Sequence, residues 1–231
     1  MPEAAEYRQT RFEPPSGALD LLLVRHGQSA PYRPGSPFPL VDGQGDPALS
    51  ADGGEQAERV GERLAREGID AVYVSTLRRT SQTAGPLCRL TGLVPQVDAG
   101  LREVSLGDWE GGLLRQKVAE GDPIAQRVIE EQRWDANPGA EPSEALMARV
   151  RTVVQRLAEA NPGRRVVAFT HGGIIGEVLH IASGAAPFAF TGADNASISQ
   201  VVVVGSRWIV RRFNDTAHLT SGFATGSTPP T

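Results

Sequence analysis

The chain has 231 residues, of which 40% are hydrophobic and 22% are charged, proportions typical of a globular protein with a sizeable buried core. Its net charge of -4 at pH 7 argues against a nucleic-acid partner, which would need a concentrated basic patch. The single cysteine, Cys88, excludes an internal disulfide framework and favours a reducing compartment, the cytoplasm. No run approaches the roughly 18 apolar residues of a membrane span, and the N-terminus lacks the apolar segment of a secretory signal.

Residues 1–18 predict a polar N-terminal extension, and the first strand is expected over Leu19–Val24. This apolar run stops at Arg25-His26-Gly27, so a polar turn begins where a buried strand ends. Ligands bind at this edge of α/β sheets. An arginine offers a planar fork of donors to phosphate, and a histidine is a nucleophile or proton carrier near neutral pH. Taken alone, the same residues are equally typical of a surface arginine and a helix-capping histidine.

A regular alternation of elements follows the first strand. A proline-rich loop over residues 31–39 precedes a helix capped by Ser50, and a second strand over Ile69–Val74 precedes a helix that starts near Arg78. This order predicts an α/β three-layer sandwich, with a mostly parallel central sheet and helices on both faces. Arg78 and Arg79 fall in the first turn of their helix, where backbone amides favour anions, although a solvated arginine pair is the alternative.

Val94–Val97 is expected to be a short edge strand, whose exposure would permit a homodimer by sheet extension. The glycine-punctuated stretch after it carries two carboxylates, Glu103 and Glu110. A carboxylic acid in a partly apolar site beside phosphate oxygens has a raised pKa and can donate a proton to a leaving oxygen. An ion pair of either glutamate with a neighbouring arginine explains the same pattern equally well.

Helical periodicity dominates the next part of the chain, and we interpret residues 105–142 as an insertion that roofs the edge of the sheet. Val166–Thr170 is then a third strong strand, and it runs into His171-Gly172-Gly173 at the start of another helix. A second apolar strand thus ends in histidine and glycine. This repetition, together with an arginine pair after a third strand, is hard to obtain by chance and favours a shared site.

The end of the chain predicts a hairpin over residues 201–213, with its turn at Gly205-Ser206. Residues 221–231 are small and polar, and we expect them to form a flexible tail. The predicted organisation is therefore a single domain over residues 19–220, between the N-terminal extension and this tail.

With these residues assembled, the stretch from Leu19 to Leu219 resembles the histidine phosphatase superfamily, also called the phosphoglycerate-mutase-like family. The resemblance implies the fold of that family. It depends on several motifs in the right order, because one alone would be weak. They are Arg25-His26-Gly27-Gln28-Ser29, Leu49-Ser50 with Gly53 and Gln56-Ala57, Ser75-Thr76-Leu77-Arg78-Arg79 with Gln82-Thr83-Ala84, Leu101-Arg102-Glu103, Gly107-Asp108-Trp109-Glu110-Gly111, Thr170-His171-Gly172-Gly173 and Asn195-Ala196-Ser197.

The resemblance implies a role for each matching residue. His26 matches the nucleophile that becomes a phosphohistidine, and Glu103 falls where members with a carboxylate general acid place it. His171 matches the second pocket histidine, which binds phosphate oxygens and stabilises charge. Phosphate binding is further assigned to Arg25, Arg79 and Gly172, and Gln28 falls on the substrate side of the pocket. Arg102 and Tyr32 are substrate-binding candidates, Tyr32 by its location alone.

The implied activity is that of a phosphatase-type member, a histidine acid phosphatase-type hydrolase of a phosphate monoester of a small metabolite. It needs neither a metal nor a cofactor, because two arginines and a histidine stabilise the charge on the phosphoryl oxygens. Imidazole attacks phosphorus, and Glu103 protonates the leaving alkoxide. Hydrolysis is favoured over isomerisation because the tryptophan-asparagine pair of the mutases is absent from residues 30–33 and because the motif over residues 107–111 resembles that of the broad phosphatases. Gly176 stands where many relatives have an arginine, which leaves part of the substrate contacts open.

Three other interpretations stay open. The first is a phosphoglycerate mutase, which would return the phosphoryl group to its substrate, and the second is a non-catalytic module that binds a phosphate ligand or another protein. The third is a metal hydrolase, although Glu177 and His180 are spaced as on an amphipathic helix surface rather than as metal ligands. His218 is expected to be a solvated histidine near the C-terminus rather than part of the pocket.

Overall fold

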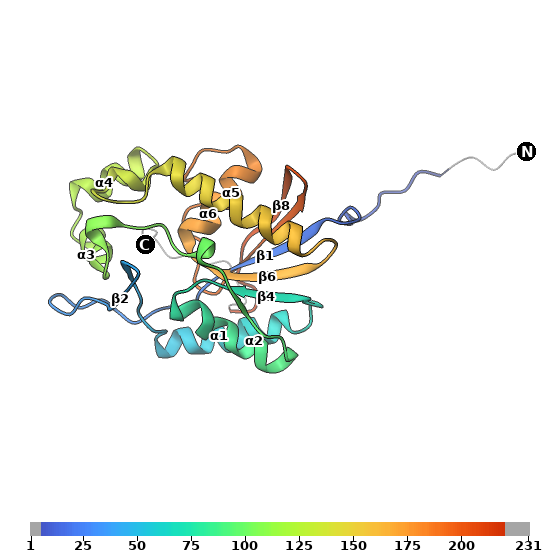
Figure 1. The fold of residues 1–231 in the computed structure, drawn as a ribbon, viewed down its shortest axis with the longest axis horizontal. Coiled ribbons are helices and arrows are strands. Elements are labelled where there is room, and N and C mark those ends of the chain that lie inside the picture. Colours follow the sequence, from blue (N-terminus) through green and yellow to red (C-terminus); the bar gives the residue numbers. More distant parts are fainter. Residues whose placement is uncertain (1–5, 220–231) are drawn as a thin grey trace, which may run out of the picture.

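The computed structural model describes residues 6–219 and shows an α/β sandwich built on one six-stranded sheet (Figure 1). The strand order is β5-β4-β6-β1-β7-β8, and the first four of these strands are parallel. β7 pairs antiparallel with β1, and β8 pairs antiparallel with β7. The predicted mostly parallel sheet is therefore confirmed. The strand bounds are β1 Leu19–Arg25, β4 Ala71–Val74, β5 Gln96–Val97, β6 Arg165–Thr170, β7 Ile198–Val204 and β8 Arg207–Asp215.

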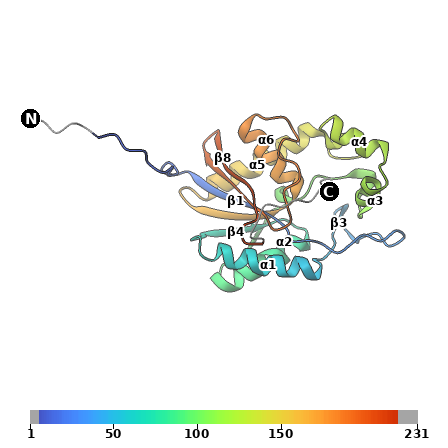
Figure 2. The ribbon, with the colours of Figure 1, turned by 180° about the vertical axis from the view of Figure 1, so that it is seen from behind.

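Helices cover both faces of the sheet, as the alternation of elements predicts. Figures 1 and 2 show α1 and α2 on one face and α5 and α6 on the other. The three layers of the sandwich are thus a helix pair, the sheet and a second helix pair. The helix bounds are α1 Ala51–Leu64, α2 Arg78–Thr91, α5 Ser143–Ala160 and α6 Gly172–Ser183.

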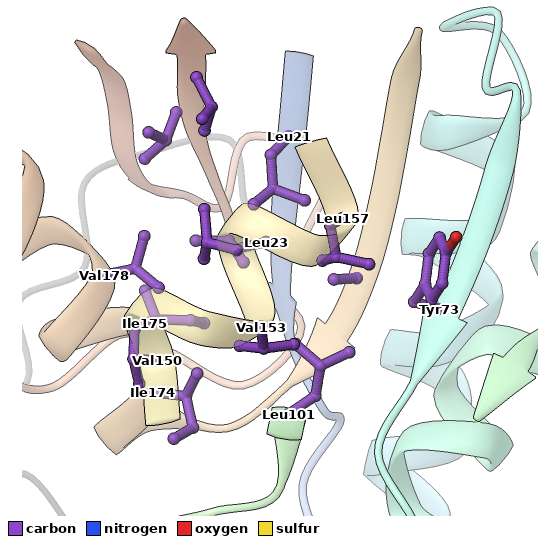
Figure 3. Packing of buried hydrophobic residues seen from close by; sticks show 14 of the residues in the cluster. Leu21, Leu23, Tyr73, Leu101, Val150, Val153, Leu157, Ile174, Ile175 and Val178 are labelled. Carbon is purple, nitrogen blue, oxygen red and sulfur yellow. The ribbon is translucent and has the colours of Figure 1, made fainter. Parts of the chain in front are cut away.

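The core lies on both sides of β1, because successive side chains of a strand point to opposite faces. Leu21 and Leu23 pack with residues of α5 and α6, as Figure 3 shows. Leu22 and Val24 belong to a second cluster with residues of α1 and α2. A strand buried on both faces is a continuous apolar run in the sequence, which is why β1 and β6 could be predicted.

The element ends follow local hydrogen bonding. Ser50 caps α1, because its side-chain oxygen accepts from the Gly53 N–H at 3.1 Å. β4 begins at Ala71 rather than at the predicted Ile69. The Asp70 N–H still donates to the Arg165 carbonyl at 2.8 Å, but the Arg165 N–H donates to the Asp70 carboxylate, also at 2.8 Å, so a side chain takes the place of a backbone acceptor at this point.

Two helices and a small hairpin lie at the carboxyl end of the parallel strands, opposite the N-terminus in Figure 1. The helices are α3 (Leu113–Ala119) and α4 (Pro123–Glu130), both within residues 105–142. The hairpin joins β2 (Leu40–Val41) to β3 (Gln44–Gly45) and was not predicted. Its turn, Asp42-Gly43, has positive φ at both residues, which is typical of a tight hairpin turn.

The described part of the N-terminal extension, residues 6–18, contains neither helix nor strand. The guanidinium of Arg211 on β8 lies 4.0 Å from the centroid of the Phe12 ring. The predicted tail over 221–231 lies outside the described residues, and the division into extension, domain and tail stays a prediction. Within residues 6–219, every helix is too short or too polar to cross a bilayer.

Candidate active site

His26 is the first residue after β1, and its backbone N–H donates to the Thr170 carbonyl of β6 at 3.0 Å. Its ring Nδ1 lies 2.7 Å from the Gly27 carbonyl oxygen. A carbonyl can only accept, so Nδ1 carries the proton and Nε2 keeps its lone pair. Burial, followed by the charges of Arg79 and Arg25, holds the pKa of His26 well below its usual value. The ring is therefore a neutral imidazole with one free nitrogen.

His171 is the first residue after β6, the strand next to β1, and its ring meets that of His26 edge to face. The ring centroids are 5.2 Å apart and the ring planes make an angle of 62°. Its Nε2 lies 2.9 Å from the Ser75 hydroxyl, and its Nδ1 is buried with no hydrogen-bond partner among the described residues. Burial and the charge of Arg79 hold the pKa of His171 well below its usual value. This ring is also neutral.

Two buried guanidiniums flank the histidines. Arg25, the last residue of β1, donates from Nη1 to the Ala193 carbonyl at 2.5 Å. Arg79, in the first turn of α2, donates from Nη1 to the Gly45 carbonyl at 2.9 Å. Burial lowers the pKa of Arg79 to about 10, so the side chain stays cationic at neutral pH.

The neighbouring Arg78 does not join this group. Its side chain is half exposed, and its Nε lies 2.7 Å from the buried Asp46 carboxylate. The structure thus separates the two arginines of the dipeptide. Arg79 lines the cavity, as the resemblance implies, and Arg78 fixes the loop that carries Gly45.

Glu103 faces the N-terminus of α6. Its Oε1 accepts from the Val104 N–H at 3.0 Å, and its Oε2 accepts from the Gly173 N–H at 3.3 Å. Burial raises the pKa of the carboxyl, although these hydrogen bonds and the charges of Arg79 and Arg25 oppose the rise. A Cβ on Gly173 would lie 2.6 Å from Oε1, so only glycine lets the helix approach this carboxyl so closely. The group is suited to carrying a proton.

A cavity of about 790 Å³ connects these groups. His26, Arg25, Arg79 and Glu103 line it together with Gly172, while His171 lies fully buried against the His26 ring. The far wall is formed mainly by apolar side chains, and several of them come from residues 105–142. They are Tyr32, Phe38, Val104, Leu106, Leu114 and Trp134.

Two of the three predicted substrate-side residues line this cavity. The Gln28 side chain is exposed, and its Oε1 accepts from the Ser50 hydroxyl at 3.2 Å. Tyr32 packs edge to face on Phe38, with ring centroids 6.0 Å apart. The polar amide and the aromatic pair therefore both lie at the cavity.

The structure contradicts the assignment of Arg102 to substrate binding. Arg102 does not line the cavity, and its guanidinium bonds to the hairpin between β2 and β3. Nη2 donates to the Val41 carbonyl at 2.8 Å, and Nη1 lies 3.2 Å from the Asp42 carboxylate. The backbone of Arg102 is extended, so its side chain and that of Glu103 leave the chain on opposite sides.

The second carboxylate of the loop, Glu110, lines the cavity but is held by backbone groups. Its Oε2 accepts from the Gly45 N–H and its Oε1 from the Leu106 N–H, both at 2.8 Å. Since the Gly45 carbonyl binds Arg79, Glu110 supports the arginine indirectly. Neither of the two interpretations offered for Glu110, a proton donor or an ion pair with arginine, describes this arrangement.

Three residues of the site were missed by the sequence reasoning. Gln44 donates from Nε2 to the Glu103 carbonyl at 2.7 Å, and Asn195 donates from Nδ2 to the His26 carbonyl at 2.9 Å. Asn195 could have been found, because it lies in one of the motifs. Arg115 of α3 lines the cavity as a third arginine, and no motif marks it.

The described residues contain no group of three or more His, Cys, Asp or Glu side chains arranged to hold a metal ion. His180 instead places Nδ1 2.7 Å from the Ala185 carbonyl, at the end of α6. His218 is half buried rather than solvated, with Nε2 3.0 Å from the Ala196 carbonyl. The Ala196 N–H in turn donates to the carbonyls of Arg25 and His26, so His218 lies behind the site.

A neutral histidine beside two arginines, at the carboxyl edge of a parallel sheet, is an arrangement suited to binding phosphate on an α/β fold. Residues 21–216 match the family model of the histidine phosphatase superfamily, branch 1. The chain belongs to this superfamily.

Similar proteins agree with this membership. The chain is 31% identical over 205 residues to phosphoglycerate mutase-like protein 4 of Arabidopsis thaliana, covering 87% of this chain and 86% of that protein. It is 36% identical over 166 residues to a glucosyl-3-phosphoglycerate phosphatase of Mycobacterium tuberculosis, covering 68% and 72%. The native structure of the mycobacterial enzyme of that name gives a TM-score of 0.72 at 32% identity, covering 86% of this chain and 100% of that chain. A phosphoglycerate mutase of Bacillus anthracis, at 22% identity and a TM-score of 0.73 over 88% and 96%, shares the fold.

Proposed function

We propose that this protein hydrolyses a phosphate monoester of a small metabolite through a phosphohistidine on Nε2 of His26. The observation that carries the proposal is the hydrogen bond from His26 Nδ1 to the Gly27 carbonyl, at 2.7 Å. It leaves Nε2 unprotonated in a cavity that is lined by the partly buried Arg25 and the buried Arg79. A nucleophile and the charges that attract its anionic target therefore meet in one place.

In the first step, Arg25 and Arg79 hold the phosphoryl oxygens while His26 attacks phosphorus. His171, to which the resemblance assigns phosphate binding, lies buried against the His26 ring and outside the cavity lining, so its role here is to position that ring. The bond between phosphorus and Nε2 forms as the bond to the ester oxygen breaks. Glu103, whose pKa is raised by burial, gives its proton to the departing alkoxide. Positive charge from the guanidiniums stabilises the phosphoryl oxygens in the transition state, so the proposed reaction uses neither a metal nor a cofactor.

In the second step, the Glu103 carboxylate takes a proton from a water molecule that attacks the phosphohistidine. The phosphorus–nitrogen bond breaks, its electron pair returns to Nε2, and inorganic phosphate leaves. His26 and Glu103 are then in their starting protonation states. A Cβ on Gly172 would lie 3.5 Å from Arg25 Nε, so the N-terminus of α6 lies close to the same phosphate site.

The similar proteins support hydrolysis of a small phosphorylated substrate. The mycobacterial relative is named a glucosyl-3-phosphoglycerate phosphatase, and solved structures of it are complexes with inorganic phosphate and with VO3. The 31% identity to a phosphoglycerate mutase-like protein keeps the mutase as the second candidate. We favour hydrolysis because residues 30–33 lack the tryptophan-asparagine pair of the mutases.

Several finer assignments belong to this proposal. An acid phosphatase type fits the lowered pKa of His26, because the nucleophile stays neutral in mildly acidic solution. The single cysteine supports the cytoplasm as the compartment. Val94 and Val97, at the exposed edge formed by β5, would permit a homodimer. Residues 105–142 would act as the roof that contacts the alcohol part of the substrate.

The test is a panel of phosphate esters, assayed for released phosphate with and without a chelator. We expect phosphate release that the chelator does not change, and free phosphate rather than 2-phosphoglycerate from 3-phosphoglycerate. Accumulation of 2-phosphoglycerate would establish the mutase instead. Activity that is lost in chelator and restored by zinc would establish a metal hydrolase, and no turnover of any ester would favour a binding module.

A further inference from the structure

Arg115, the third residue of α3, is held directly above the loop that follows His26. Its Nη2 donates to the Ser29 hydroxyl at 2.6 Å, and its Nη1 donates to the Ala30 carbonyl at 2.8 Å. The guanidinium carbon lies 5.3 Å from the centroid of the Phe38 ring. Two hydrogen bonds and a ring contact thus fix this cation against Ser29 and Ala30, the third and fourth residues after His26 in the chain.

The charge of Arg115 is not balanced by a carboxylate. Within residues 6–219, none of its nitrogens lies within the 4.0 Å of an ion pair, whereas Arg149 and Arg165 pair with Glu141 and Asp20. Burial, followed by repulsion from Arg25, lowers the pKa of Arg115. A partly buried cation beside another cation is costly, and a bound anion relieves that cost.

A phosphoryl group alone does not fill the cavity that Arg115 lines. The cavity of about 790 Å³ is within the range of roughly 300–1,000 Å³ typical of sites that enclose whole small ligands. Arg25 and Arg79 are already placed beside His26, whereas Arg115 lines the cavity from α3 and is bonded to Ser29 and Ala30. Beside it lie the Tyr32 and Phe38 rings, which offer apolar contact to the alcohol part of an ester.

We propose that Arg115 binds a second anionic group, a carboxylate or a second phosphate, on the alcohol part of the substrate. This inference rests on the proposed phosphatase function. The guanidinium carries five N–H groups, of which two are used by Ser29 and Ala30, so further donors remain for a planar two-point contact with an oxyanion. The enzyme would then select esters that carry two anionic groups over esters that carry one.

A matched pair of substrates tests the proposal. 3-Phosphoglycerate and glycerol 3-phosphate differ by a carboxylate in place of a hydroxymethyl group. Arg115→Leu should lower kcat/KM for 3-phosphoglycerate by about 10- to 100-fold, the usual loss for a charge-assisted hydrogen bond, and should change glycerol 3-phosphate by less than about threefold. Arg115→Lys should keep part of the preference. Fructose 1,6-bisphosphate and fructose 6-phosphate form the second arm, in which the extra anion is a phosphate.

Arg127→Leu is the control, because Arg127 is an exposed arginine of α4 that pairs with Glu131 at 3.3 Å. It should change none of these ratios. Equal losses on both members of each pair in Arg115→Leu would overturn the proposal and place Arg115 in phosphoryl binding or in the fold. A wild-type protein with no preference in either arm would also overturn it.

The same comparison by equilibrium binding separates this inference from the phosphatase function. His26→Ala protein cannot form the phosphohistidine, so the dissociation constants of both esters can be measured by calorimetry in that background. If the wild-type protein hydrolyses none of the esters of the panel, the proposed function fails. The role of Arg115 is then still tested by the binding measurements. We expect Arg115→Leu to weaken binding of 3-phosphoglycerate alone, and equal weakening for both esters would contradict the inference.

Discussion

His26 and His171 occupy equivalent positions on neighbouring parallel strands, and their rings meet edge to face with centroids 5.2 Å apart. Arg25 pairs in register with Thr170, so the residue that follows each of them lies at the same level of the sheet. Strand register, rather than a flexible loop, sets this distance. On its other side β1 pairs antiparallel with β7, so the site lies where the strand direction changes.

Replacing Glu103 with Gln should lower activity by an amount that depends on the leaving group of the substrate. The neutral amide cannot donate a proton, so kcat/KM for an alkyl phosphate, which reports formation of the phosphohistidine and not its hydrolysis, should fall by about 10²- to 10⁴-fold. The loss should be much smaller for p-nitrophenyl phosphate, because nitrophenolate leaves without a proton. In the wild type, kcat for the alkyl ester should decline as pH rises through the raised pKa of Glu103. Equal losses on the two substrates would show that Glu103 is not the acid.

Gly173→Ala tests the close approach of α6 to the same carboxyl. The new Cβ would lie 2.6 Å from Glu103 Oε1 and 3.2 Å from Val104 Cγ1, so the carboxyl must shift. We expect a loss of about 10-fold or more in kcat for alkyl esters, since even a small displacement of a reacting group lowers the rate strongly. Gly54→Ala in α1 is the control, because nothing lies within 4 Å of its Cβ. A Gly173→Ala enzyme as active as Gly54→Ala would refute this role of the glycine.

The parts of the fold that could be predicted are those encoded locally. β1 and β6 are continuous apolar runs, α1 has its cap at Ser50, and β5 lies at the predicted edge. The histidines, Arg25 and the Arg78-Arg79 pair were identified because each falls at the carboxyl end of a strand or in the first turn of the helix that follows. The choice of Arg79 over Arg78 came from the family resemblance. These positions are fixed by the order of elements along the chain.

The remaining part of the site depends on contacts between distant segments. Arg115 reaches the cavity only because α3 packs over Ser29 and Ala30, a contact across more than 80 residues of chain. Arg102 was assigned to the substrate and lies in the same motif as Glu103, but extended backbone sends adjacent side chains in opposite directions. The local sequence predicts neither the position of Arg115 at the cavity nor the direction of the Arg102 side chain.

The lowered pKa values of His26 and His171 predict a specific dependence of stability on pH. Below about pH 6.5 the unfolded chain's histidines take up protons that these folded histidines do not, so the free energy of unfolding falls as pH falls. The drop in Tm between pH 7.5 and pH 5.5 should therefore be smaller in the double variant His26→Asn, His171→Asn than in the wild type. The same drop in both proteins, measured by calorimetry, would mean that neither histidine has a lowered pKa.

Ser75→Ala should impair the second histidine without touching the nucleophile. The Ser75 hydroxyl is the hydrogen-bond partner of His171 Nε2 at 2.9 Å and is buried beside Thr80. Without it, we expect kcat/KM to fall about 10-fold, and the ¹⁵N chemical shifts of the His171 ring to report a changed mixture of tautomers.

The control for Ser75 is Ser199→Ala, which removes another buried hydroxyl, one that accepts from the Asn214 N–H at 3.2 Å. Both variants should lose about 1–3 kcal/mol of stability, since each leaves a buried polar group without its partner. Only Ser75→Ala should lose activity. Equal activity in the two variants would mean that the hydroxyl has no influence on His171.

The central claim is tested most directly by trapping the covalent intermediate. The protein is mixed with a phosphate ester, quenched in alkali within one turnover, and digested so that the phosphorylated residue can be mapped by mass spectrometry. We predict base-stable, acid-labile phosphate on Nε2 of His26, because Nδ1 is occupied by the Gly27 carbonyl. The His26→Ala protein should carry none and should still bind inorganic phosphate. Release of phosphate without any phosphorylated protein, or phosphate on a residue other than His26, would contradict the account.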